Sequence, residues 1–463
     1  MTKESEITWA SKFLFFLLCA VVVVTALAYG TVHQPTIAIF YILAVVTVLL
    51  WATDAFLSGA LRFNKSLLQI PLIATILYGI VQIIPFGSLA ETAGVSGIAR
   101  TLSLDPFWTK IATIHFFALL IFFAAFLVFI DSAKRLRKVV TLITIFGFAF
   151  AFFAILQAVL SPNKIYGIYE VPNASPFGSF VNRHNFAAYM EMTLCLPLGL
   201  MFVGAVNKDR RLLYITAIAL MGIALILSGS RGGLVSLVAA IFFLVILTTK
   251  TKSSGQLWLK IGLAVLLIST LVIGSVLIGG ESSLTRFAET ANSQDFSTSR
   301  THIWSVTLQI ILNNLPFGTG LGAFGVAYTS YDSLDGLARV EQAHNDYLEV
   351  LANAGIVGLA IGLFFVFSLF RTGLANAKTS NTFRRGVCVG ALTGCFAILV
   401  HSLFDFVLHT TAISVLFLML VSLVVASGNK FSDDIQEAAP RRRKKASAAS
   451  VTPIEKGRRT RKD

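Results

Sequence analysis

Charged residues are scarce in this sequence: Asp, Glu, Lys and Arg together make up 13% of its 463 residues. An ordinary soluble domain has about 25%. Hydrophobic residues make up 56% of the chain. A soluble protein of this length must cover its exterior with polar groups, and this chain has too few of them. The composition excludes soluble, fibrous and disordered proteins and indicates a membrane protein.

Cysteine is also rare. The four cysteines, Cys19, Cys195, Cys388 and Cys395, lie in apolar stretches, and their spacing is not that of metal ligands. A thiol in such surroundings behaves as a small hydrophobic group. We therefore expect no disulfide and no metal site.

Long apolar runs dominate what is present. A helix needs about 20 mostly apolar residues to cross a hydrocarbon layer of about 30 Å. Twelve runs meet or approach this length, at residues 13–29, 35–51, 67–84, 111–130, 139–160, 186–206, 212–227, 233–249, 259–278, 355–370, 386–405 and 408–426. They predict an all-α polytopic membrane protein with about 12 transmembrane helices.

The orientation follows from the lysines and arginines, which are retained on the cytoplasmic side. With both termini in the cytoplasm, 29 of the 37 basic residues fall on the cytoplasmic side. Lys3 and Lys12 precede an apolar run that ends in a passable cleavage site at Ala26-Leu27-Ala28, but we expect this first helix to be retained.

Four regions follow along the chain. Residues 1–278 hold the first nine spans, residues 279–354 form a large outer loop, residues 355–427 hold the last three spans, and residues 428–463 form a basic tail. We expect the tail to be disordered and to contact anionic lipid, because a basic run beside a last span is typical of that role. No base-reading motif accompanies it, so we expect no nucleic-acid partner.

The large outer loop contains a helical pattern at residues 300–312 and glycines at positions 318, 320, 322 and 325. We expect it to form a partly helical lid over the membrane. Before the fourth span, Asp105 and Pro106 predict a helix start with Trp108 as an interfacial anchor.

Arg231 lies in the turn Ser228-Gly229-Ser230-Arg231-Gly232-Gly233 between two apolar helices, at the outer boundary of the membrane. One interpretation is an arginine that reaches lipid phosphates. The other is a fixed cation for a phosphate-bearing substrate, which the neighbouring glycines allow to approach closely.

A second cluster leads into the sixth span. Asn182 and Asn185 can cap this helix, and Arg183 and His184 add a cation and an imidazole to its N-terminus, where anions bind readily. Glu191 follows inside the span, where an ionisable group is costly and is a candidate site residue.

A third cluster, Ala343-His344-Asn345-Asp346-Tyr347-Leu348-Glu349, precedes the tenth span. The carboxylates of Asp346 and Glu349 lie close to His344 in sequence, which suggests a general base oriented by an acid. His401 and Asp405 lie four positions apart in the sequence, so their side chains could meet, and structural pairing is the favoured role for them.

These segments resemble the O-antigen ligase and O-antigen polymerase superfamily of bacterial inner-membrane proteins. The resemblance covers about residues 173–410 and is carried by FGSFVNRHN, LSGSRGG, TSRTHIWSVTLQIILNNLPFGTGLGAF, AHNDYLEVLANAGIVG and HSLFDF, in this order. It implies a helical, metal-independent glycosyltransferase without a cofactor. Such a protein would take a glycan from undecaprenyl diphosphate and join it to an acceptor at the periplasmic face.

Carried over to this chain, the resemblance points to Arg231, Arg300 and His344 as catalytic residues, with His344 as the general base. Arg183 lies where the family commonly shows a looser N-x-x-N pattern. We expect the diphosphate or glycan to be contacted by Arg183, His184, Asn182, Asn185 and Asn345, with support from Glu349, Asp346, Glu191, His401 and Asp405.

The acceptor stays open at this point. Lipid A core is the favoured acceptor, which would make the protein a ligase, and we expect a displacement that inverts the anomeric carbon. Polymerisation of a lipid-linked repeat and transfer to a protein hydroxyl use the same donor. A transporter or flippase with 12 spans is an alternative of another class, but no repeated halves are evident and the polar clusters gather at the outer ends of spans.

Overall fold

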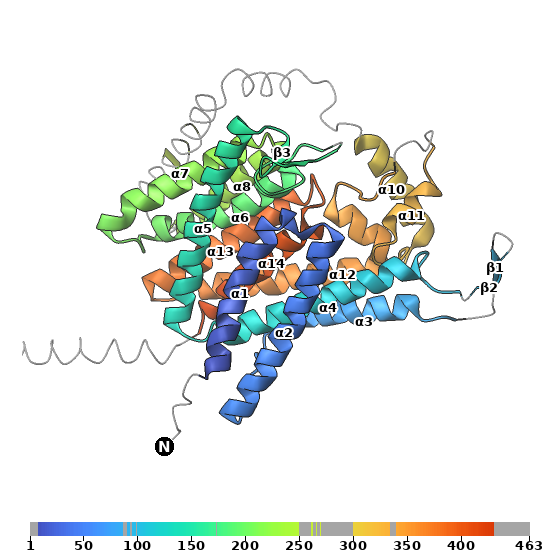
Figure 1. Cartoon of the computed structure of the whole chain (residues 1–463), viewed down its shortest axis with the longest axis horizontal. Coiled ribbons are helices and arrows are strands. Elements are labelled where there is room, and N and C mark those ends of the chain that lie inside the picture. The colour runs from blue at the N-terminus through green and yellow to red at the C-terminus, as the bar shows by residue number, and fades with distance from the viewer. Residues whose placement is uncertain are drawn as a thin grey trace, which may run out of the picture.

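The computed structural model describes residues 8–86, 90–92, 95–98, 100–172, 174–249, 300–333 and 339–429, with residues 261, 262, 265 and 269. These residues form a helical bundle (Figure 1). Its helices are α1 Trp9–Leu27, α2 Gln34–Ser58, α3 Gln69–Ile83, α4 Pro106–Phe129, α5 Ala133–Leu160, α6 Arg183–Val203, α7 Arg211–Leu227, α8 Arg231–Thr248, α10 Arg300–Asn314, α11 Phe324–Thr329, α12 Asp346–Asn376, α13 Thr382–His401 and α14 Thr411–Ala426.

Short elements join the helices. In the described part of the chain, three 3-10 turns are η1 Tyr29–Thr31, η2 Lys208–Arg210 and η3 Val407–His409. The same residues include two small antiparallel hairpins, which pair β1 Ala90–Thr92 with β2 Val95–Ile98 and β3 Lys164–Ile165 with β4 Tyr169–Glu170. The hairpins were not expected from the apolar pattern, because their strands are only two to four residues long.

Among the described residues, nine helices are long and apolar enough to cross a membrane, and the shorter apolar helices α3 and α14 occupy two further predicted spans. The prediction of an all-α polytopic membrane protein is therefore confirmed for the fold class. The span predicted at 259–278 falls outside the described residues except for four helical positions, as does the tail beyond residue 429. The number of spans and their orientation therefore stay predictions.

Side-chain caps fix where several helices begin. Asp105 accepts a hydrogen bond from the Trp108 amide at the start of α4, with Pro106 in the first turn, as expected. Asn182 caps α6 in the same way through the His184 amide, which confirms the predicted capping role. Both caps are contacts between residues two or three positions apart.

Helices α6 and α13 lie at the centre of the bundle, where most of their residues are buried. Gly199 and Gly390 bring the two backbones together: a Cβ added at Gly199 would lie 2.3 Å from the Gly390 Cα. Small residues commonly permit such close helix crossings in membranes. This close packing holds rigidly the two helices that lead into the candidate site.

A second, smaller core lies beside the bundle, where α10 and α11 pack against the first turns of α12 (Figure 1). Helix α12 breaks at Gly355, which has φ +59°, so the predicted span start coincides with this break. Gly318 and Gly320 also have positive φ and pack tightly against Asn353 and Ser103. These glycines therefore anchor the segment after α10 instead of serving as a loose connection.

Candidate functional site

Asp405 lies at the centre of the site, in the connection between α13 and η3. Its carboxylate is 2% exposed. Oδ1 lies 3.2 Å from His344 Nδ1, and Oδ2 accepts a hydrogen bond of 3.2 Å from the Arg300 guanidinium. Arg300 also donates to the carbonyl of Phe404. One buried carboxylate thus joins two of the three predicted catalytic residues.

The charges around Asp405 keep it ionised. Burial alone would raise the pKa of this carboxyl. The hydrogen bond from His344 and the positive charge of Arg300 oppose the effect of burial, and the pKa lies below its ordinary value. A carboxylate can only accept hydrogen bonds, so His344 Nδ1 must carry the hydrogen in their contact.

His344 is held in an orientation suited to a base. Its backbone has φ +50°, a conformation that is uncommon outside glycine and is often found at functional sites. The next residue, Asn345, caps α12 through the amides of Tyr347 and Leu348. The imidazole packs edge-on against Phe406, and its side chain is 31% exposed. With hydrogen on Nδ1, the neutral ring has Nε2 as its proton acceptor.

The acids next to His344 in sequence take other partners, which corrects the expectation that they orient it. Glu349 accepts a hydrogen bond of 2.8 Å from the Ala343 amide and lies 3.4 Å from His409. Asp346 lies 3.6 Å from His409 and accepts from the Leu408 amide. The first turn of α12 carries both carboxylates toward η3, whereas His344 precedes the helix and turns toward Asp405.

His184 approaches the same carboxylate from α6. Its Nδ1 lies 2.9 Å from the Ser230 hydroxyl and 3.7 Å from Asp405 Oδ2. Ser230 also caps α8 through the Gly233 amide. Arg231 is the first residue of α8, directly after this serine. The structure therefore brings the second sequence cluster and the Arg231 turn to the site, with Arg183 and Asn185 in the first turn of α6.

Glu191 and His401 form a fully buried pair beneath this layer. His401 Nδ1 lies 3.2 Å from both Glu191 carboxylate oxygens, and the Ser236 hydroxyl donates to the same carboxylate. A Cβ added at Gly232 would lie 3.0 Å from His401. His401 therefore pairs across helices with Glu191, and its predicted meeting with Asp405 is not the contact that forms.

Sequence reasoning missed three contributors: Ser230, Ser236 and His409. Ser230 could have been found as the residue before the first helical position of α8, where serine commonly caps. Ser236 looks like an ordinary small residue in an apolar helix, and only the crossing of α6 and α8 reveals its contact. His409 follows the HSLFDF segment by three residues, with no local partner to single it out.

The arrangement of His344, Asp405 and Arg300 can activate a hydroxyl group and stabilise a negative charge. His344 offers an imidazole nitrogen whose opposite side is held by Asp405, the arrangement that orients a general base. Arg300 uses two of its five N–H donors on Phe404 and Asp405, which leaves others for a ligand.

Comparison with protein-family models gives a match over part of the chain. Residues 216–363 match the family model described as O-antigen ligase, a stretch that contains Arg231, Arg300 and His344. No curated protein matches the chain significantly. Members of the matched family are glycosyltransferase-like enzymes. The predicted resemblance to the O-antigen ligase superfamily is thus confirmed over residues 216–363 of this multi-pass membrane protein.

Proposed function

We propose that this protein transfers a glycan from undecaprenyl diphosphate to a lipid A core acceptor at the periplasmic face of the bacterial inner membrane. One observation carries the proposal: within a matched family domain, His344 and Arg300 converge on the buried carboxylate of Asp405. Helices α6, α8 and α13 bring further polar groups to the same end of the bundle.

In this mechanism His344 is the general base. Its Nε2 takes the proton of the acceptor hydroxyl as that oxygen attacks the anomeric carbon, and Asp405 stabilises the imidazolium that forms. The bond between the anomeric carbon and the phosphate oxygen breaks at the same time. The electron pair leaves with undecaprenyl diphosphate, so a single displacement inverts the anomeric configuration.

The arginines have separate tasks. Arg231 begins α8, where the backbone amides of a helix N-terminus also favour an anion. We assign it to the departing diphosphate, whose oxygens match the planar guanidinium. Arg300 donates to Asp405 and to the Phe404 carbonyl, and we assign its remaining N–H donors to the developing negative charge. In this proposal, the departing diphosphate is also bordered by Arg183, Asn182, Asn185 and Asn345.

A reconstituted assay tests the function. The purified full chain is mixed with an undecaprenyl-diphosphate-linked glycan and lipid A core, with a chelator present and no nucleotide. Glycan on the core, lost in His344→Ala, is the result expected of a metal-independent ligase.

The same assay separates the alternatives. A longer lipid-linked glycan would make the protein a polymerase that uses the same donor, and glycan on an added protein acceptor would indicate protein glycosylation. If no acceptor is modified while the lipid-linked glycan crosses the membrane of a proteoliposome, the protein is a flippase and the proposal is wrong.

A further inference from the structure

The end of the bundle opposite the candidate site carries a second group of charges, which surrounds the start of α5. Arg135 points inward, where it contacts Asp131 at 3.2 Å and donates to the Ser11 hydroxyl. Arg62 binds the same aspartate at 3.0 Å and Asp54 at 2.7 Å. The two aspartates of this inner network are thus already paired with arginines.

Three other cations of α5 point outward. Lys134, Arg137 and Lys138 are exposed, and spacings of three and four residues put them on one face of the helix. In the described parts of the chain, no ion pair joins any of the three to a carboxylate. The Arg137 guanidinium lies 5.1 Å from the centre of the Phe383 ring. The positive charge of this face is therefore uncompensated by neighbouring side chains.

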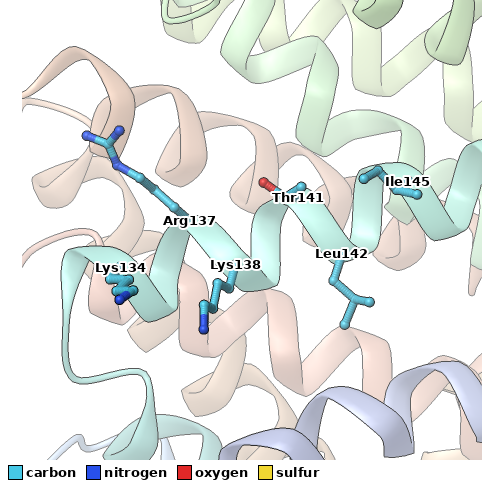
Figure 2. A pocket seen from close by; sticks show the side chains of 6 residues that line it. All are labelled: Lys134, Arg137, Lys138, Thr141, Leu142 and Ile145. Carbon is cyan, nitrogen blue, oxygen red and sulfur yellow. The ribbon is translucent and has the colours of Figure 1, made fainter.

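These cations line one end of a groove of about 460 Å³, whose other end is formed by Thr141, Leu142 and Ile145. Figure 2 shows the six side chains on successive turns of α5, with the cations at one end and the aliphatic pair at the other. The rise from Lys134 to Ile145 is about 16 Å at 1.5 Å per residue. That is close to the depth of one hydrocarbon leaflet, about 15 Å.

We propose that this α5 groove binds one anionic glycerophospholipid, with the headgroup phosphate on Lys134, Arg137 and Lys138 and an acyl chain along Leu142 and Ile145. Like charges this close repel one another unless an anion lies among them. A free phosphate would satisfy the cations but would leave the aliphatic end of the groove unfilled. A phospholipid satisfies both ends, because the length of about 16 Å between them is close to the depth of one hydrocarbon leaflet.

The inference concerns a surface distant from His344 and does not depend on the proposed reaction. It also differs from the predicted contact of the tail with lipid, because the groove consists of described residues in a packed helix. The predicted topology puts this end on the cytoplasmic side, where anionic lipids attract basic residues.

Native mass spectrometry of the purified full chain tests the proposal. The protein is titrated with dioleoylphosphatidylglycerol, with dioleoylphosphatidylcholine, and with inorganic phosphate alone. The expected result is one tightly bound phosphatidylglycerol, weaker phosphatidylcholine binding, and no displacement by millimolar phosphate. Combining Lys134→Gln, Arg137→Gln and Lys138→Gln should weaken that binding about 100-fold, since each basic residue contributes about 1 kcal/mol near a lipid surface.

The matched control removes the same charge elsewhere at that end of the bundle, with Lys208→Gln, Arg210→Gln and Arg211→Gln on exposed residues of η2 and the start of α7. It should leave the tight site intact. Ile145→Trp keeps every cation but fills the aliphatic end of the groove, and should also weaken binding. Thermal unfolding and gel filtration establish that each variant is folded.

Several outcomes would overturn the proposal. They are unchanged phosphatidylglycerol affinity in the folded α5 triple variant, an equal loss in the η2 control, and displacement by inorganic phosphate alone. The last outcome would make the groove a simple phosphate site. Unchanged affinity in Ile145→Trp would show that the acyl chain does not use the groove.

Discussion

His344 Nδ1 lies 3.2 Å from Asp405 Oδ1, although 61 residues separate the two along the chain. The contact joins the loop before α12 to the connection after α13. It gives the histidine a buried, ionised partner and leaves the opposite ring nitrogen for a substrate hydroxyl. The sequence around His344 suggested Asp346 or Glu349 as its partner, because both acids are near it along the chain. In the tertiary structure its partner is Asp405, which is distant in sequence.

Replacing His344 by alanine should lower the transfer rate by about 10²–10⁴-fold, because that is the usual contribution of a general base. The measurement is glycan transfer by the purified variant at saturating donor. His302 is a matched control: its side chain is 30% exposed, and its Nε2 lies 3.0 Å from Asp332. His302→Gln should retain transfer. If His344→Ala also retains it, the histidine has no part in the reaction.

Asp405→Asn should reduce transfer by about 10²-fold or more. An asparagine amide can donate to His344 Nδ1 and so favour the tautomer with hydrogen on Nε2, which cannot accept a proton. The double variant His344→Ala, Asp405→Asn should be no slower than His344→Ala, because the two residues act as a unit. Additive losses would argue against this coupling. Asp346→Asn, by comparison, should retain transfer per folded molecule.

Arg231→Ala should slow transfer by about 10²–10³-fold, the usual cost of losing one charged contact to a departing anion. Arg231→Lys keeps the positive charge but not the planar pair of donors, so we expect only partial recovery. Steady-state kinetics with the lipid-linked donor distinguish the three proteins. Full recovery by lysine would mean that charge alone matters, and unchanged kinetics in the alanine variant would remove Arg231 from the mechanism.

Gly318→Ala should destabilise the fold by about 1–3 kcal/mol more than Gly204→Ala, because overpacking adds a cost of that size. The two glycines have nearly equal φ, +76° and +77°. A Cβ at Gly318 would lie 2.5 Å from the Asn353 carbonyl carbon, whereas a Cβ at Gly204 would meet nothing within 4 Å. Denaturant unfolding in detergent measures both. Equal losses would show that only the backbone conformation matters.

The stability contributed by Asp405 should depend on pH in a defined direction. Its pKa is lowered in the folded protein, so its contribution is complete above the unfolded pKa of about 3.9 and is lost as the pH falls toward the folded value. The difference in melting temperature between wild type and Asp405→Asn should therefore stay constant from about pH 7 to 5 and shrink below about pH 4. A difference that shrinks between pH 7 and 5 would contradict an ionised Asp405.

Much of the membrane architecture could be read from the sequence, since it depends on local properties. Runs of apolar residues fold as helices in a membrane because their backbone groups must be hydrogen-bonded within the segment. Helix starts at Asp105 and Asn182 were also predictable, because a cap is a contact between residues two or three positions apart. The hairpins were not, because each depends on a few backbone contacts in a polar connection.

The candidate residues were recognisable from the sequence because polar side chains at the ends of apolar helices are few. Their pairing was decided only by the tertiary structure. Helix α13 passes α6 through the contact of Gly199 with Gly390, which brings His401 to Glu191 and leaves Asp405 for His344 and Arg300. A side chain's partner in a bundle depends on how helices cross, and no local spacing encodes that crossing.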